Sequence, residues 1–360
     1  MSPEPRPEIQ RIPPAVHGAF DFAELEHLGI APEAVLDFSV NGNPYGPSPQ
    51  VREAIAHVPL DRYPDRDALA LRRVLAAQLH VPLEQLLVGN GSSELLWLLA
   101  LAFLRPEDRV VLVGPTFGAY ARAVTVMGAH LEQYTTVPEE GFCVNPAAVA
   151  RALRHLQPRL VFICNPNNPT GTLLPPETIV AWAVACPQTL VVVDEAYLPF
   201  VAHAPSLVAH LTANMLVLHS MTKAHALAGL RLGYAVGPPN IIAALARVRP
   251  PWSVNALAQA AGIAALQDTA HVESCLAQVA RAKQELVAGM AILGLHPVPS
   301  ATHFFLLPVT HGATLRRALL RHDILVRDCA SFGLPTYIRL ATRRPQDNVR
   351  LLAALKAEMS

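Results

Sequence analysis

The sequence predicts an α/β protein, with a mainly parallel sheet covered by helices and a smaller α+β domain. Short apolar runs without polar alternation recur through the middle of the chain, as expected for strands that are buried on both faces. Segments with helical spacing lie between most of these runs. The 360 residues are 52% hydrophobic and only 16% charged, which suits one large core and one smaller core.

Six apolar runs are expected to form the main sheet. They are residues 86–88, 110–113, 160–163, 190–193, 216–218 and 232–236. Residues 93–104 and 176–186 have helical spacing. Beyond Pro250 and Pro251 the pattern changes to a largely helical stretch, residues 256–294, followed by expected strands at 303–307 and 336–341 around another helix. We therefore predict an N-terminal arm that joins the small domain (1–48), a large domain (49–254) and a small C-terminal domain (255–360), with a small-molecule site between the two domains.

Composition argues against several classes of partner and location. Lys plus Arg (28) equals Asp plus Glu (28), and without a basic block we expect neither nucleic acid nor a membrane surface as partner. The longest apolar run, residues 95–104, is too short to span a bilayer, and the proline-rich start does not resemble a signal peptide. Five cysteines without a CxxC pair favour a cytoplasmic location. No metal site is predicted, because the histidines and cysteines form no cluster with ligand spacing.

Polar segments follow the predicted strands, at the edge where such sheets bind ligands. Gly91, Ser92 and Ser93 follow the first strand and open a helix, so they form either a phosphate cradle or an ordinary capped turn. Residues 165–171 (NPNNPTG) are unusually rich in turn-forming residues, and an Asn amide there can donate to a ring oxygen of a ligand.

Two charged positions extend this pattern. Asp194 ends a buried strand, where a carboxylate is costly unless a positive group meets it, such as a protonated pyridine nitrogen. A metal site of the Walker B kind is rejected, because no phosphate-binding loop precedes it. Lys223 lies among small and apolar residues, where burial lowers a lysine pKa and makes it a nucleophile toward an aldehyde.

The residues around Lys223 complete the set. Ser220, Thr222 and Arg231 can share a phosphate with the cradle at residues 91–93, although Arg231 in a structural ion pair is the alternative. A phosphate cradle, a ring-nitrogen partner, a ring-oxygen donor and a reactive lysine together match one cofactor, pyridoxal phosphate (PLP).

On these motifs the chain resembles the fold type I PLP enzymes of the aminotransferase class I/II group, over nearly its whole length. Segments 165–171, 194–197 and 220–234 stand in the expected order. The resemblance implies a PLP-dependent transferase-like large domain in which Lys223 is the Schiff-base lysine and general acid/base. It places Asp194 at the pyridine nitrogen, Asn168 and Tyr197 at the ring hydroxyl and Phe117 on the ring. The implied phosphate ligands are Gly91, Ser92, Ser93, Ser220, Thr222 and Arg231.

The resemblance also implies a homodimer. Tyr63, in the segment RYPD, is similar to the tyrosine that reaches the phosphate of the neighbouring subunit.

Within that group, two subfamilies compete. Stretches 37–41, 251–258 and 324–330 look more like the threonine-phosphate decarboxylases of cobalamin biosynthesis, so the sequence favours a lyase acting on L-threonine O-3-phosphate. Tyr197 and residues 43–47 look more like histidinol-phosphate aminotransferases that use 2-oxoglutarate and glutamate, which are the alternative. Both candidate substrates carry an amine and a phosphate monoester. The resemblance also implies the residues that contact the substrate, by transfer to the matching positions of this chain. They are His17, Gly18, Asn41, Arg327 and Arg339.

Two other classes are less well supported. A nicotinamide-dependent dehydrogenase needs a Gly-x-Gly-x-x-Gly fingerprint after its first strand, and the third glycine is missing. A non-catalytic protein on the same scaffold would be expected to lack Lys223 or Asp194, and both are present.

Overall fold

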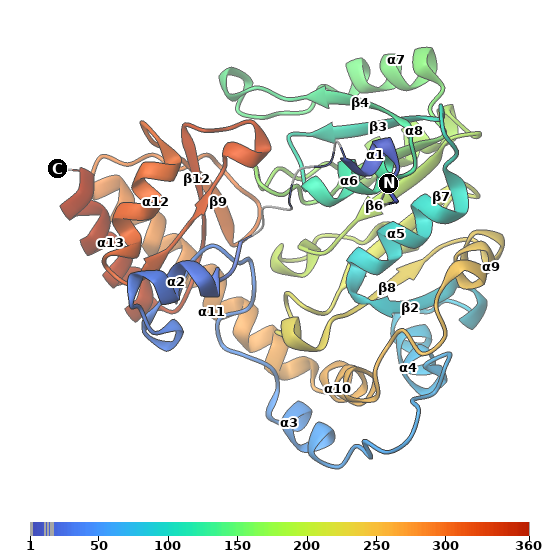
Figure 1. Ribbon diagram of the computed structural model, residues 1–360, viewed down its shortest axis with the longest axis horizontal. Helices are drawn as coiled ribbons and strands as arrows, with labels where there is room; N and C mark the ends of the chain where they lie inside the picture. The colour runs from blue at the N-terminus through green and yellow to red at the C-terminus, as the bar shows by residue number, and fades with distance from the viewer. Residues whose placement is uncertain (1–2, 11, 13, 15–17, 360) are drawn as a thin grey trace.

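The computed structural model describes residues 3–10, 12, 14 and 18–359. Its centre is a seven-stranded sheet in the order β2-β8-β7-β6-β5-β3-β4 (Figure 1). The strands are β2 (Leu86–Asn90), β3 (Arg109–Gly114), β4 (His130–Thr135), β5 (Leu160–Cys164), β6 (Leu190–Asp194), β7 (Met215–Ser220) and β8 (Leu232–Val236). Every neighbouring pair is parallel except the two pairs that β8 makes. The predicted mainly parallel sheet and its six predicted strands are confirmed.

Helices cover both faces of this sheet, since strands such as β5 are buried at every position. In β5, Val161 and Ile163 pack into one core while Leu160 and Phe162 pack into the other. The helices on the first face are α3 (Pro49–Ala56), α4 (Leu69–Leu79), α7 (Pro146–Leu156), α8 (Pro176–Ala185) and α10 (Ala256–Gln267). Those on the second face are α5 (Gly91–Phe103), α6 (Gly118–Val126) and α9 (Pro239–Val248). The predicted helices at 93–104 and 176–186 correspond to α5 and α8.

Strand β4 is the one member of the main sheet that the apolar pattern does not predict. Its sequence, HLEQYT, is mostly polar, and it has no fully buried residue. It lies at the edge of the sheet beside β3. An edge strand needs no continuous apolar run, because only one side of it pairs with another strand.

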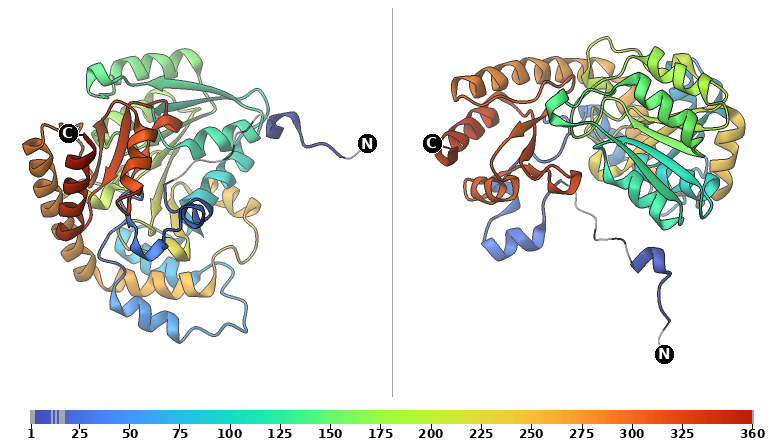
Figure 2. Two further views of the ribbon diagram at one scale, coloured as in Figure 1. Left: turned by 60° about the vertical axis from the view of Figure 1, so that its left-hand side comes forward. Right: turned by 90° about the horizontal axis from the view of Figure 1, so that it is seen from above.

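A smaller α+β unit lies beside the main sheet (Figure 2). Its antiparallel sheet has the order β11 (Arg327–Asp328), β12 (Tyr337–Ala341), β9 (Phe304–Pro308), and a short parallel pair joins β1 (Leu36–Asp37) to β10 (Ile324–Leu325). Its helices are α2 (Phe22–Leu28), α11 (Thr269–Ile292), α12 (Gly312–Leu320) and α13 (Pro345–Met359). The predicted smaller unit and its strands near 303–307 and 336–341 are confirmed.

The two units are connected through the N-terminal arm and through the α10–α11 segment. Leu25 and Val35 of the N-terminal arm pack on the small unit, whereas α1 (Pro7–Gln10) lies against α6 of the large unit. Helix α10 packs on α3 and α4 in the main core, and the later half of α11 packs in the small unit. The domain boundaries at residues 48 and 254 remain a prediction. The contacts of α10 nevertheless attach it to the large unit.

The most apolar segment, residues 95–104, lies almost entirely in α5, which has 13 residues. A bilayer-spanning helix needs roughly 20. Within the part of the chain that the structure describes, no helix combines the length and apolarity needed to cross a membrane.

Candidate active site

The predicted functional segments meet at one edge of the main sheet. The carboxyl ends of β2, β5, β6 and β7 point to the same edge, because these strands run in one direction. Strand β8 runs the other way, so Arg231, which precedes it, reaches that edge as well. This is the edge at which open α/β sheets bind ligands.

Lys223 follows β7 and is mostly enclosed. Its backbone carbonyl accepts a hydrogen bond from the Asn43 amide at 3.1 Å, and its Nζ lies 5.8 Å from the centroid of the Tyr197 ring. The pKa of Lys223 is lowered to about 8, first by burial and then by the nearby Arg339 and Arg231, while Asp194 opposes the shift. An appreciable fraction of the amine is therefore neutral near physiological pH, as a nucleophile requires.

Two hydrogen bonds hold the Asp194 carboxylate, and the sequence analysis did not predict the donor of one of them. Its Oδ2 accepts a hydrogen bond from the Tyr120 hydroxyl at 2.8 Å, and its Oδ1 accepts one from the Ala196 amide at 3.0 Å. Burial raises the pKa of the Asp194 carboxyl, while both hydrogen bonds and Lys223 favour its charged form. Tyr120 was not predicted, although it lies three residues after Phe117 in α6, a spacing that places both on one face. The Tyr120 ring is fixed by stacking on Phe162, with 5.1 Å between centroids.

The turn after β2 brings Arg231 against the first residues of α5. Gly91 has a φ of +76°, and a Cβ added there would lie 2.7 Å from Nη2 of Arg231. The guanidinium group of Arg231 therefore sits against the start of α5. Neither Ser92 nor Ser93 is the N-cap; that position is Asn90, whose side chain makes no capping hydrogen bond. The first amides of α5 can thus bind an anion, and the alternative of a serine-capped turn is not observed.

Two hydroxyl side chains and the arginine complete this cradle. Ser220 and Thr222 are buried, and their hydroxyl oxygens lie 2.7 Å apart. Gly233 of β8 pairs with Ser220, and a Cβ on Gly233 would lie 2.5 Å from the Ser92 nitrogen. Among the described residues, no carboxylate lies within ion-pair distance of Arg231, so its alternative assignment to a structural ion pair is not supported.

The loop after β5 presents Asn168 toward the small unit. Its Oδ1 accepts a hydrogen bond from Nη1 of Arg339, which leaves the Nδ2 end to donate. The neighbouring Asn167 donates to the Pro115 carbonyl at 2.9 Å and so ties this loop to the segment that carries Phe117. Tyr197 is buried beside Phe304, with ring centroids 4.8 Å apart, and burial raises the pKa of its hydroxyl.

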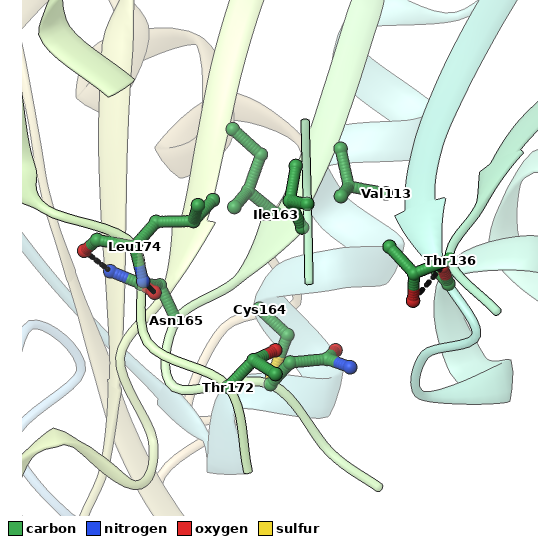
Figure 3. Close-up of a pocket in the computed structure, with 10 residues that line it drawn as sticks. Val113, Thr136, Ile163, Cys164, Asn165, Thr172 and Leu174 are labelled. Carbon is green, nitrogen blue, oxygen red and sulfur yellow. Dashed lines mark hydrogen bonds between the residues drawn. The ribbon is translucent and has the colours of Figure 1, made fainter. Parts of the chain in front are cut away.

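A small pocket lies behind this loop, at the carboxyl ends of β3 and β5 (Figure 3). Asn165 closes one side by hydrogen bonds in both directions with the Leu174 backbone, at 3.0 and 2.7 Å. Its volume of about 10 Å³ accommodates one water molecule and no substrate.

The small unit contributes a pair of arginines. Arg327 of β11 and Arg339 of β12 are direct partners across the two strands. Arg327 donates to the Ser331 hydroxyl at 2.6 Å, and Arg339 donates to the Ser39 carbonyl as well as to Asn168. Both are buried, and burial lowers the pKa of each. Like charges on opposed strands destabilise a sheet, so this pair favours binding of an anion.

The remaining predicted substrate contacts lie in or near the same region. A Cβ on Gly18 would lie 2.4 Å from the Ser39 carbonyl, the acceptor of Arg339, so Gly18 packs directly against the arginine site. Asn41 is buried, and both polar atoms of its side chain have no hydrogen-bond partner in the described chain. His17 lies outside the described residues.

Tyr63 is not part of the site of its own chain. It lies on the loop between α3 and α4, is 81% exposed and stacks on Trp252, with 4.7 Å between ring centroids. The described residues leave this pair partly uncovered, since Trp252 is also 44% exposed.

A cleft of about 640 Å³ opens between the main sheet and the small unit. One wall contains Thr116 and Phe117, and the other contains residues 331–337, beginning with Ser331, the hydrogen-bond partner of Arg327. Its lining includes Phe117 and Ser331 but not Lys223 or the arginine pair, so the cleft meets the candidate site at its margin.

Comparison with known proteins identifies the family. A family model described as aminotransferase class I and II matches residues 33–355. The chain belongs to the class I and II aminotransferases. The histidinol-phosphate aminotransferase of Symbiobacterium thermophilum is 39% identical to it over 98% of both chains. The crystal structure of the histidinol-phosphate aminotransferase from Sinorhizobium meliloti in complex with pyridoxal-5'-phosphate is 26% identical, with a TM-score of 0.87 over 98% of both chains.

The L-threonine-O-3-phosphate decarboxylase of Porphyromonas gingivalis is also similar. It is 27% identical, with a TM-score of 0.79, over 89% of this chain and 98% of that one. With the family shown, the predictions of a PLP-dependent aminotransferase fold and of PLP as cofactor are confirmed.

The favoured prediction of a threonine-phosphate decarboxylase is wrong. Curated relatives that are 35–39% identical are named histidinol-phosphate aminotransferases, which supports the alternative instead. The physical reason is that the stretches resembling the decarboxylases belong to a site that suits the substrates of both reactions. Residues 37–41 and 324–330 contain Ser39 and Arg327, which build the anion site. Both candidate substrates carry a phosphate monoester, so an anion site does not distinguish the two reactions.

Proposed function

We propose that this enzyme is an aminotransferase of the histidinol-phosphate type, which moves the amino group of a small phosphorylated amine to 2-oxoglutarate. The observation that carries the choice of reaction is the 35–39% identity to curated relatives named histidinol-phosphate aminotransferases. Two built anion sites support a phosphorylated substrate. One is the cradle at Gly91 and Arg231 beside Lys223, and the other is the buried pair Arg327 and Arg339. A cofactor phosphate would occupy the first, and a substrate anion would occupy the second.

The residues present fit PLP. Lys223 has a lowered pKa, Asp194 is a buried carboxylate that lacks a cation, and a Cβ at Gly91 would fill the anion cradle. Lys223 would attach the cofactor, Asp194 would hold its protonated ring nitrogen, and Asn168 and Tyr197 would face the ring hydroxyl. The phosphate would lie on Gly91, Ser92, Ser93, Ser220, Thr222 and Arg231, and Phe117 would stack on the ring.

When bound, PLP supplies an electron sink for the bonds at the carbon that carries the amino group. The chain decides which bond is cleaved. Lys223 can accept and return a proton at that carbon, because its pKa of about 8 keeps both forms populated. Arg327 and Arg339 orient the substrate through its anion: the phosphate of the amine in one half-reaction, and a carboxylate of 2-oxoglutarate in the other. Gly18 and Asn41 lie beside this anion site and complete its wall.

We further propose that the active unit is a homodimer in which Tyr63 reaches the phosphate in the neighbouring subunit. Its exposure of 81% in the single chain supports this, because an aromatic ring that faces solvent is available to a partner. A cytoplasmic location, inferred from the odd number of cysteines, remains a prediction.

The test is an assay of the purified, PLP-loaded enzyme with histidinol phosphate and 2-oxoglutarate. We expect glutamate to form and no CO₂ to be released. L-Threonine O-3-phosphate, assayed in parallel for CO₂, is expected to give no product. Lys223→Ala is expected to abolish both the activity and the visible absorbance of the bound cofactor. Absence of glutamate with a fully loaded enzyme would contradict the proposed substrate pair.

A further inference from the structure

His303 is a buried side chain without an assigned role. It precedes β9 and is 2% exposed. Neither ring nitrogen makes a hydrogen bond of ordinary geometry with the described residues, although the Asn41 backbone lies close enough to favour the protonated form slightly. The ring instead stacks on Phe200 of η4 (Leu198–Phe200), with 3.6 Å between centroids and an interplanar angle of 23°. Burial of an imidazole with at most one weak hydrogen bond is unfavourable, so the ring contacts must offset that cost.

His303 belongs to a chain of four rings that links the two units, which we call the aromatic junction: Phe200, His303, Phe304 and Tyr197. The edge of His303 meets Phe304 at 5.5 Å, and Phe304 meets Tyr197 at 4.8 Å. Phe200 and Tyr197 follow β6 of the main sheet, whereas His303 and Phe304 begin β9 of the small sheet. The junction therefore fixes the distance between the two sheets beside the site.

The aromatic junction also supports the anion-binding arginine. The Cζ atom of Arg339 lies 5.7 Å from the centroid of the Phe304 ring, a cation–π contact. Phe304 pairs with Ala341, two residues beyond Arg339, and the His303 carbonyl accepts a hydrogen bond from the Thr342 amide at 2.8 Å. A shift of the His303 ring would thus move the surface on which Arg339 rests.

The charges that face His303 are all positive. They are Arg339 on β12, Lys223 after β7 and Lys283 on α11. Burial is the main reason that the pKa of His303 lies well below its usual range, and these three charges lower it further. Burial and these charges therefore favour the neutral form of the ring. It behaves as a flat spacer and does not act as a proton donor.

We propose that His303 is a positioning residue for anion binding, which acts by holding Phe304 under Arg339 and needs its planar neutral ring but not its nitrogens. The proposal rests on the anion-binding role of Arg339 in the proposed function. According to this proposal, His303 affects the affinity for the anion and does not affect the rate of the chemical step.

The test compares four variants of the PLP-loaded enzyme. His303→Ala removes the ring, His303→Phe keeps a flat neutral ring against Phe200, and His155→Ala, at an exposed site on α7, is the control. The dissociation constant of inorganic phosphate is measured from the visible absorbance of the bound cofactor, with Arg339→Gln as the variant that loses the anion site. Thermal melting reports whether each variant is folded.

We expect His303→Ala to weaken phosphate binding about two- to tenfold, the range that loss of one aromatic pair gives. KM for 2-oxoglutarate should rise by the same factor with kcat unchanged. His303→Phe should match the wild type between pH 6 and 8. Unchanged phosphate binding in folded His303→Ala, or equal weakening in His303→Phe, would overturn the proposal. If the enzyme does not turn over histidinol phosphate but the phosphate affinities follow this order, only the proposed substrate fails.

Discussion

At the scale of single residues, the site consists of ionisable groups that the fold has removed from water. Lys223, Asp194 and Arg339 each have a pKa shifted toward the neutral form, with burial as the largest cause. Isolated buried charges are unfavourable, and a ligand that brings the opposite charge removes that cost. The free enzyme is therefore expected to be less stable than the loaded one.

The hydroxyl of Tyr120 should matter for the cofactor rather than for the fold. Tyr120→Phe keeps the stacking on Phe162 and removes the 2.8 Å hydrogen bond to Asp194. A hydrogen bond to a charged group contributes about 1.5–3 kcal/mol, so PLP should bind about tenfold to a hundredfold more weakly. Titration of the cofactor-free protein with PLP measures this, with Tyr134→Phe on β4 as control. Unchanged PLP affinity would show that Tyr120 does not support Asp194.

The lowered pKa of Lys223 predicts a pH dependence of stability in the cofactor-free protein. Between its folded pKa of about 8 and the ordinary value of 10.5, the unfolded chain binds a proton at Lys223 that the folded chain does not bind. Lys223 therefore makes the free energy of unfolding increase as the pH rises through this interval. Chemical denaturation from pH 7 to 10.5 should show this contribution in the wild type relative to Lys223→Met. Parallel curves for the two proteins would refute it.

At the scale of elements, the phosphate cradle depends on a close approach between β8 and the start of α5. Gly233 permits that approach, because any Cβ there would meet the Ser92 backbone nitrogen. Backbone atoms at this contact cannot rotate away as a flexible side chain could. The amides of α5 are therefore aimed at the ligand by a strand that is more than 130 residues later in the chain.

Gly233→Ala should damage both stability and PLP binding. Overpacking of this kind costs about 1–3 kcal/mol, and the shift it forces occurs at the cradle itself. We expect a lower melting temperature together with weaker PLP binding. Gly118→Ala is the matched control, because a Cβ there meets nothing within 4 Å. If both variants bound PLP as the wild type does, Gly233 would not shape the cradle.

At the scale of the whole molecule, two units contribute to the candidate site, and Tyr63 lies exposed on the surface. The main sheet provides the cofactor edge, the small unit provides the arginine pair, and Tyr63 faces away from both. In a homodimer with isologous symmetry, each subunit could give Tyr63 to the other.

Mixing two inactive variants tests that exchange directly. A dimer of Lys223→Ala with Tyr63→Ala contains one site with both residues intact, but only if Tyr63 acts across the interface. An equimolar mixture allowed to exchange subunits should regain about a quarter of wild-type activity above the Tyr63→Ala residual. No recovery with proven subunit exchange would place Tyr63 in its own chain's site or outside any site.

The sequence by itself determined the main sheet and the residues at its strand ends. These are local patterns: a buried strand is a continuous apolar run, and Asp194 or Lys223 follows its strand within a few positions. Edge strand β4 escaped detection because a half-paired, half-exposed strand carries no such run.

Only the tertiary structure decided which distant residues meet. The Tyr120–Asp194 bond joins positions 74 apart, and the Arg339–Asn168 bond joins positions 171 apart. The cross-strand pairing of Arg327 with Arg339 and the stacking of His303 on Phe200 are of the same kind. No local pattern encodes such contacts, because they depend on strand register and on how two separately packed units face each other.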